Sequence, residues 1–101
     1  MSKPRMTAPT LRVLNILLAE RREELSGADI ARRGYIASGT LYPILLRLEE
    51  AGWLASRWEA IDPKVAGRPR RRLYRITGVG AANAASATNE IVAPSGATVW
   101  A

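Results

Sequence analysis

The chain has 101 residues, with 15 basic and nine acidic side chains, a net charge of +6, and neither histidine nor cysteine. The missing residue types exclude disulfides, ordinary zinc sites and catalytic arrangements of the Ser-His-Asp or Cys-His kind, so we expect no enzyme, metal or cofactor. The length predicts one small domain, and the charge is equally consistent with DNA, RNA or an anionic membrane as the partner.

The positive charge is confined to the first three quarters of the chain. Every basic residue lies at or before Arg75, and residues 76–101 carry only Glu90. Residues 1–7 are basic, but the apolar run after them is interrupted by Arg12 and is not typical of a signal peptide. No apolar run approaches the roughly 18 residues that span a bilayer. We therefore expect a flexible lead over residues 1–7 and a cytoplasmic protein without membrane contact.

The first helical pattern starts after Thr7, which can cap a helix that has Pro9 in its first turn. This helix is predicted to end at about Arg21 or Arg22. Its apolar stripe is broad, which predicts burial on more than one side. The leucines of the stripe, at helical spacing, are Leu11, Leu14, Leu17 and Leu18.

A second, short helix is predicted to begin with the capping-box sequence Ser26-Gly27-Ala28-Asp29 and to stop at Gly34. Its last turn carries Arg32 and Arg33. Two interpretations of these arginines stay open. They are favourable charges at a helix C-terminus, or they contact a nucleic-acid backbone.

The third helix is predicted to begin at Ser38, as its N-cap, and to end before Gly52 in the C′ position. Its outward face holds Thr40, Tyr42, Pro43 and, one turn later, Arg47. A helix with such a small, polar N-terminal end suits the DNA major groove. Its core face has the spacing i, i+3, i+4 and i+7 and consists of Leu41, Ile44, Leu45 and Leu48.

Each of these outward residues also has a structural interpretation. Ser38, Gly39 and Thr40 form an ordinary cap, or they direct N–H groups and the helix dipole at a phosphate. Tyr42 packs half-buried against the following hairpin, or it contacts a phosphate or a thymine methyl group. Arg47 forms an exposed ion pair of marginal energy, or it contacts a phosphate or a guanine. We favour DNA contact for all of them, together with Pro43.

From residue 53 the apolar period changes from 3.6 to 2, which predicts a β-hairpin with strands over 53–58 and 70–77 and a loop over 61–69. Tyr74 and Ile76 share the face that we expect to point inward. The tryptophans Trp53 and Trp58 are also expected in the core. Trp100, near the end of the chain, is consistent with a disordered tail or with an anchor in a partner subunit.

The hairpin carries the densest basic cluster of the chain. A run of charge is most often a solvated surface, and three consecutive arginines cannot all point to one face of a strand. Residues 57–75 nevertheless hold seven basic side chains against only Glu59 and Asp62. We therefore favour contacts to DNA phosphates, with room for one arginine in the minor groove. The residues proposed for these contacts are Lys64, Arg68, Arg70, Arg71 and Arg72.

Thr77 can cap a fourth, alanine-rich helix over about 79–92. The order helix, helix, helix, strand, strand, helix predicts a mainly α fold with a small β-hairpin, a winged helix-turn-helix. We expect a DNA-binding domain over 8–77, a C-terminal helix over 78–93 and a flexible tail over 94–101.

Two motifs resemble the PadR family of bacterial winged-helix transcriptional regulators, and the resemblance covers about Thr7 to Ala82. The first is Ser38-Gly39-Thr40-Leu41-Tyr42-Pro43, followed by Arg47-Leu48-Glu49-Glu50 and Gly52. The second is the hairpin over 67–77, followed by Gly80. The resemblance implies a homodimeric repressor that binds a palindromic operator, with the third helix in the major groove and the wing on the adjacent backbone or minor groove.

The same resemblance implies a dimer built from the C-terminal helix and aided by the first. In some relatives a pocket between the two C-terminal helices binds aromatic or drug-like ligands and releases the DNA. This chain departs from the family after Thr77, where Gly78 and Val79 replace acidic residues. Because the departure lies in the C-terminal helix, it affects what the resemblance implies for the dimer contact and the ligand pocket more than what it implies for DNA binding. The candidate dimer residues are Leu11, Leu14, Leu18, Val79, Ala82, Ala85 and Ile91.

Other functions are also consistent with the sequence. One is a winged-helix module that binds RNA or protein through the basic hairpin, although the grooves of an RNA duplex do not admit a helix for base reading. Another is a ligand-responsive regulator with an apolar pocket at the dimer seam.

Overall fold

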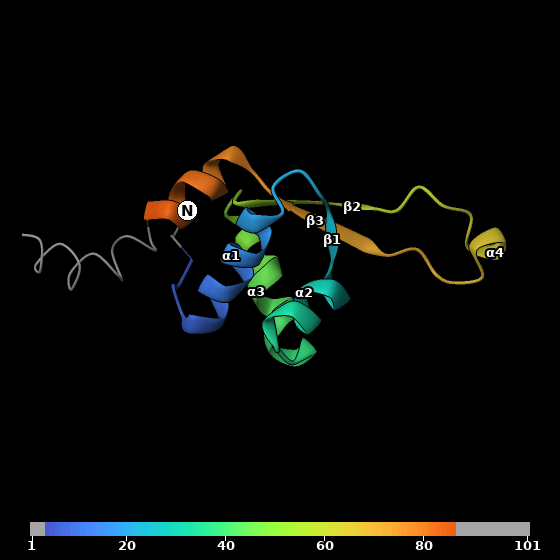
Figure 1. The fold of residues 1–101 in the computed structure, drawn as a ribbon, viewed down its shortest axis with the longest axis horizontal. Coiled ribbons are helices and arrows are strands. Elements are labelled where there is room, and N and C mark those ends of the chain that lie inside the picture. Colours follow the sequence, from blue (N-terminus) through green and yellow to red (C-terminus); the bar gives the residue numbers. More distant parts are fainter. Residues whose placement is uncertain (1–3, 87–101) are drawn as a thin grey trace, which may run out of the picture.

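The computed structural model describes residues 4–86, in which helices pack at one end of a long β-hairpin (Figure 1). The strands form a three-stranded antiparallel sheet in the order β1-β3-β2. A further helix covers residues 78–86. The architecture is the predicted winged helix-turn-helix with one additional strand. Its elements are α1 (Ala8–Ala19), β1 (Leu25–Ser26), α2 (Gly27–Gly34), α3 (Ser38–Glu50), β2 (Leu54–Trp58), α4 (Pro63–Ala66) and β3 (Arg72–Ile76).

Helix α1 begins as predicted but is shorter. The Thr7 hydroxyl accepts a hydrogen bond from the Thr10 N–H, and a proline stands in the first turn. The helix ends at Ala19 rather than at residue 21 or 22. The chain must turn there because, six residues later, Leu25 already pairs with Tyr74 in the sheet.

Strand β1 does not follow from the sequence, because two residues are too few to show a period. Leu25 pairs with Tyr74, and Ser26 pairs with Leu73. Ser26 is also the N-cap of α2. Its hydroxyl accepts from the Asp29 N–H at 3.1 Å, and the Asp29 carboxylate accepts from the Ser26 N–H, which confirms the predicted capping box. The sheet therefore leads directly into α2.

The hairpin loop contains a helical turn, α4, where an irregular loop is expected from the sequence. The Asp62 carboxylate caps α4 by accepting from the Lys64 N–H at 2.9 Å, and Gly67 ends it with a φ of 71°. Four residues are again too few to reveal a period. This turn lies at the far end of the hairpin, well away from the helices (Figure 1).

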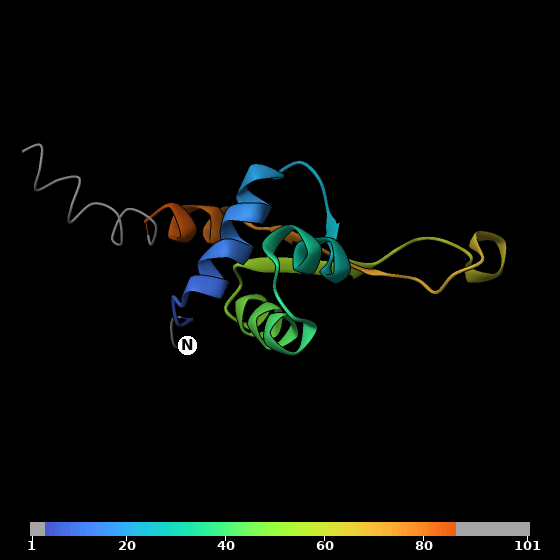
Figure 2. The ribbon, with the colours of Figure 1, turned by 60° about the horizontal axis from the view of Figure 1, so that its bottom comes forward.

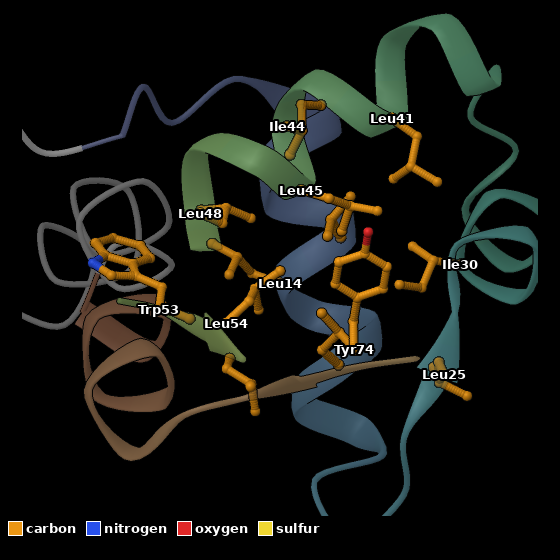
Figure 3. Packing of buried hydrophobic residues seen from close by; sticks show 14 of the residues in the cluster. Leu14, Leu25, Ile30, Leu41, Ile44, Leu45, Leu48, Trp53, Leu54 and Tyr74 are labelled. Carbon is orange, nitrogen blue, oxygen red and sulfur yellow. The ribbon is translucent and has the colours of Figure 1, made fainter. Parts of the chain in front are cut away.

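One apolar cluster joins the helices to the sheet (Figure 3). The predicted core residues of α3, Leu41, Ile44, Leu45 and Leu48, are all buried. Tyr74 and Ile76 point inward as predicted, and burial raises the pKa of the Tyr74 hydroxyl. Trp53 is buried as expected.

The expectation that Trp58 lies in the core is wrong. Its side chain is 59% exposed, because it lies at the end of β2, where the hairpin begins to extend away from the helices (Figure 2). In the sheet it pairs with Arg72, and the guanidinium of that residue lies 5.1 Å from the centre of the indole ring. This is a cation–π contact on the surface of the hairpin.

The C-terminal helix packs closely on the start of the hairpin. The Thr77 hydroxyl caps it by accepting from the Gly80 N–H at 2.9 Å. A Cβ atom on Gly80 would lie 2.1 Å from the Trp53 carbonyl oxygen, so only glycine fits there. Ala81 and Ala84 are buried in the same contact. The other predicted features of this region, namely the helix to residue 92, Ile91, Pro94-Ser95-Gly96 and Trp100, lie outside the described residues.

Candidate nucleic-acid interface

The N-terminal end of α3 is exposed and has no side-chain cap. The predicted cap at Ser38 is wrong. Ala37 occupies the N-cap position, and Ser38 is the first helical residue. Before this start, Tyr35 adopts a left-handed conformation with φ 52°, and Ile36 is buried in the core. Within residues 4–86 no side chain accepts the first N–H groups of α3, so they and the positive end of the helix dipole can receive an anionic oxygen.

The outward face of α3 contains more apolar surface than the sequence motif suggests. Gly39, Pro43 and Leu46 follow one another at i, i+4 and i+7 and are all exposed, and Leu46 is 57% exposed. Leu46 is not among the DNA-contact residues predicted from the sequence, because a leucine in an amphipathic helix is ordinarily assigned to the core. The signal that separates it is its position outside the buried i, i+3, i+4, i+7 series.

Pro43 interrupts the hydrogen-bond pattern of α3. It is the sixth residue of the helix and lies in the second turn. Proline has no N–H, so the Gly39 carbonyl lacks its usual i+4 donor. The outward face therefore offers a backbone acceptor as well as apolar groups.

Tyr42 joins α3 to the start of α2. Its ring lies against Gly27, where a Cβ atom would be 2.6 Å from the Tyr42 hydroxyl oxygen. The side chain is 47% exposed, so it is half-buried, against α2 as well as toward the hairpin. It also borders a hollow of about 330 Å³ between α2, α3 and the hairpin. The hollow is lined by Ser26, Gly27, Ala28, Tyr42, Trp58, Arg70, Arg71 and Arg72.

The predicted basic residues of the hairpin do not all project freely. Arg68 binds the Glu59 carboxylate through two guanidinium nitrogens at 2.6 and 3.0 Å, and the Arg71 N–H donates to the same carboxylate at 2.9 Å. The hydrogen bond from Arg68, with that of the Arg71 N–H, lowers the pKa of Glu59 to about 2. Arg68 therefore closes the hairpin loop, a role that the residue pattern does not reveal.

Arg72 and Arg70 are partly engaged. Arg72 Nε donates to the Ser56 hydroxyl at 3.0 Å, and its Nη2 lies 3.8 Å from the Glu49 carboxylate at the end of α3. Arg70 Nε donates to the Ile61 carbonyl at 2.9 Å. These contacts fix where the two guanidinium groups lie, while Arg70 stays exposed.

Three of the predicted basic contact residues have exposed side chains that no ion pair or hydrogen bond holds within the part of the chain that the structure describes. They are Arg47, Lys64 and Arg71. Arg47 borders a small hollow together with Pro4, Arg5 and Thr10, so the lead segment brings a second exposed arginine beside it. The unpaired charges of these three residues thus lie at two places, beside α3 and along the hairpin.

Three further arginines in the described part of the chain form ion pairs. Arg32 pairs with Asp29 at 2.9 Å, and Arg33 pairs with Glu20 at 3.1 Å. Arg57 binds Glu24 through Nε at 2.8 and 2.9 Å, and this contact lowers the pKa of Glu24.

Within residues 4–86 no group of three or more acidic side chains could hold a metal ion, and no helix there is long and apolar enough to cross a bilayer.

The candidate dimer residues differ in exposure. Leu14 is fully buried in the monomer core, so it has no side-chain surface to offer a partner, and its assignment to a dimer contact is corrected. Leu11 and Leu18 are partly buried, and Val79 is 60% exposed beside the exposed Ala82 and Ala85. Ile91 lies outside the described residues.

The sequence matches that of known regulators. The profile of the transcriptional regulator PadR-like family matches residues 14–86. Transcriptional regulator Rv3488 of Mycobacterium tuberculosis is 39% identical over 74 residues, which cover 68% of this chain and 64% of the mycobacterial protein. The chain thus spans less than two thirds of that relative.

The fold matches solved structures of bacterial proteins. The MepR–DNA complex of S. aureus superposes with a TM-score of 0.69 at 21% identity, over 94% of this chain and 71% of MepR. The protein smu.1704 of Streptococcus mutans superposes with a TM-score of 0.66 at 29% identity, over 94% of this chain and 87% of that protein. These similarities cover the helices and the hairpin alike.

Proposed function

The chain belongs to the PadR-like family of transcriptional regulators, and from that membership we propose that it binds duplex DNA as a homodimer and represses transcription from a palindromic operator. The observation that carries the proposal is the hollow between α2, α3 and the hairpin, where Tyr42 lies beside three consecutive arginines. A hollow of this composition, next to an exposed helix, fits a sugar–phosphate strand at the edge of a groove.

In this arrangement α3 enters the major groove with its N-terminal end foremost, as recognition helices do. The free N–H groups at Ser38 and Gly39 and the side chains of Thr40 and Arg47 contact the groove walls. The neighbouring strand of the duplex passes through the hollow, along Tyr42. The hairpin then follows the backbone with its exposed cations, which are Lys64, Arg70, Arg71 and the accessible part of Arg72. Arg68 stabilises the loop and does not contribute a free charge.

The dimer is proposed to form through the C-terminal helix, so that residues 8–77 are the DNA-binding unit, residues 78–93 the dimer contact, and residues 1–7 and 94–101 its extensions. Val79, Ala82 and Ala85 leave an exposed apolar strip on that helix. A twofold dimer places two copies of α3 about one turn of DNA apart, which corresponds to a palindromic site.

Selection from randomised DNA tests the proposal. The full chain is incubated with a pool of random duplexes, bound sequences are amplified, and the dissociation constant of the enriched site is measured between about 50 and 200 mM salt. Recovery of an inverted repeat is expected. If about six phosphates are neutralised, its affinity falls by about three orders of magnitude over this range. A pool that stays random, or structured RNA that binds as tightly as the enriched duplex, contradicts it.

A further inference from the structure

The central line of the outward face of α3 is apolar, and three of its features are unfavourable or unnecessary for the fold itself. The first is Gly39. A Cβ atom there meets no described atom within 4 Å, and Gly39 has no positive φ, so neither packing nor backbone geometry calls for glycine. Glycine inside a helix is less favourable than alanine. A missing side chain leaves room for close approach by something outside the monomer.

The second feature is Pro43, one turn after Gly39 on the same line. A proline in the second turn removes a helical hydrogen bond and is unfavourable for the helix. Its ring is exposed. The third is Leu46, which is 57% exposed and lies outside the core face. Residues that oppose the local rules of a fold are expected where a ligand is bound.

Polar groups border this line on both sides. By helical geometry, Thr40 and Arg47 lie along one edge and Tyr42 along the other. Glu50 continues the central line toward the C-terminus, where its carboxylate would repel phosphates, so the contact ends within the first three turns. An apolar strip between polar edges matches the floor of a major groove between two phosphate backbones.

We propose that Gly39, Pro43 and Leu46 form a methyl-reading strip and that Leu46 is a specificity-determining residue that recognises the C5-methyl group of thymine. The methyl group of thymine is the one apolar feature that base pairs present in the major groove. A guanine is read by an arginine or lysine, and neither stands on this line. The operator half-site therefore contains at least one thymine under Leu46. This inference rests on the proposed function, because it assigns the bases that α3 reads.

Deoxyuridine provides the test, because it keeps every hydrogen-bonding group of thymine and lacks only the methyl group. Each thymine of the enriched duplex is replaced singly by deoxyuridine, and affinities are measured by fluorescence anisotropy. At one half-site position the wild-type chain is expected to bind the uracil duplex about fourfold more weakly, the effect of one buried methyl group. Leu46→Ala is expected to bind the thymine and uracil duplexes equally at that position.

Two further variants serve as controls for the role of Leu46 in the thymine preference. Leu46→Met retains an apolar side chain that can reach the methyl group and is expected to restore the preference for thymine. Val65→Ala truncates an exposed apolar residue of α4 and is expected to leave the preference unchanged. Circular dichroism confirms that each variant is folded. An enriched inverted repeat with no uracil-sensitive position, or a preference that persists in Leu46→Ala, overturns the inference while the proposed function stands. Failure to enrich any duplex contradicts the proposed function itself.

Discussion

Arg68 and Glu59 close the hairpin loop as an ion pair in which two guanidinium nitrogens bind the two carboxylate oxygens. The same carboxylate accepts the Arg71 N–H, so a single acidic residue holds both ends of the segment that leads into β3. The carboxylate of Glu59 therefore fixes the conformation of the hairpin loop. It also compensates Arg68, so the arginines of this cluster are not equivalent.

Arg71→Ala is expected to weaken binding to operator and random duplexes alike and to lower the slope of log affinity against log salt by about one. The reason is that Arg71 has an exposed side chain with no ion pair within residues 4–86. Arg57→Ala removes the same formal charge, but that arginine is already paired with Glu24, and its salt slope is expected to match the wild type. Equal slopes for the two variants would contradict these roles. Affinity measured across a salt series decides between them.

The contribution of Glu59 to stability depends on pH in a defined window. Arg68 holds the pKa of Glu59 at about 2 in the folded chain, below its ordinary value of 4.5. A lowered carboxylate pKa stabilises the fold fully above 4.5, and this stabilisation is lost as pH falls from 4.5 toward 2. Glu59→Gln lacks it at every pH. The difference in melting temperature between wild type and Glu59→Gln is expected to shrink across this window. A difference that stays constant from pH 7 to 2 would contradict the ion pair.

Gly80→Ala is expected to destabilise the chain by about 1–3 kcal/mol, because the new Cβ atom would overlap the Trp53 carbonyl and force the C-terminal helix off the hairpin. Gly78→Ala is the matched control, since nothing described lies within 4 Å of a Cβ there. That variant is expected to be neutral or slightly more stable. Urea unfolding of both measures the difference, and equal stabilities would mean that the two elements do not pack as described.

Gly39→Ala is expected to separate stability from binding. It should stabilise the monomer by about 0.5–1 kcal/mol, because alanine favours a helix and meets no described atom. The same methyl group should weaken operator binding, because it fills the space through which DNA approaches α3. Thermal unfolding and anisotropy on one preparation measure both effects. A variant that is more stable and binds equally well would show that Gly39 has no part in the interface.

Much of the fold could be predicted from local signals. The capping box at Ser26, the core spacing of α3 from Leu41 to Leu48, and the alternation that turns Tyr74 inward are each short-range patterns with one physical meaning. The elements that could not be predicted, β1 and α4, are too short to have a period. They form because the neighbouring elements hold these short segments where they can pair with a strand or make a turn.

The candidate site could be predicted only as a set of residue types. The basic hairpin and the outward face of α3 follow from the sequence, but side-chain partners do not. Whether Arg68 is free or paired depends on Glu59, nine residues earlier, and on the turn between them. Trp58 is exposed because the hairpin extends beyond the helices, and Leu14 is buried because α1 is covered within the monomer.

The sequence by itself determined the winged helix-turn-helix, because apolar periodicity, caps and turn residues act within a few positions of one another. It also determined the excess of positive charge, which is a sum over the chain. Only the tertiary structure decided which charges stay uncompensated and which apolar side chain remains in solvent. The reason is that an ion pair or a buried surface depends on how the elements and turns that carry the residues are placed relative to one another. Leu46 and Arg68 are the two cases in which that distinction changes the interface.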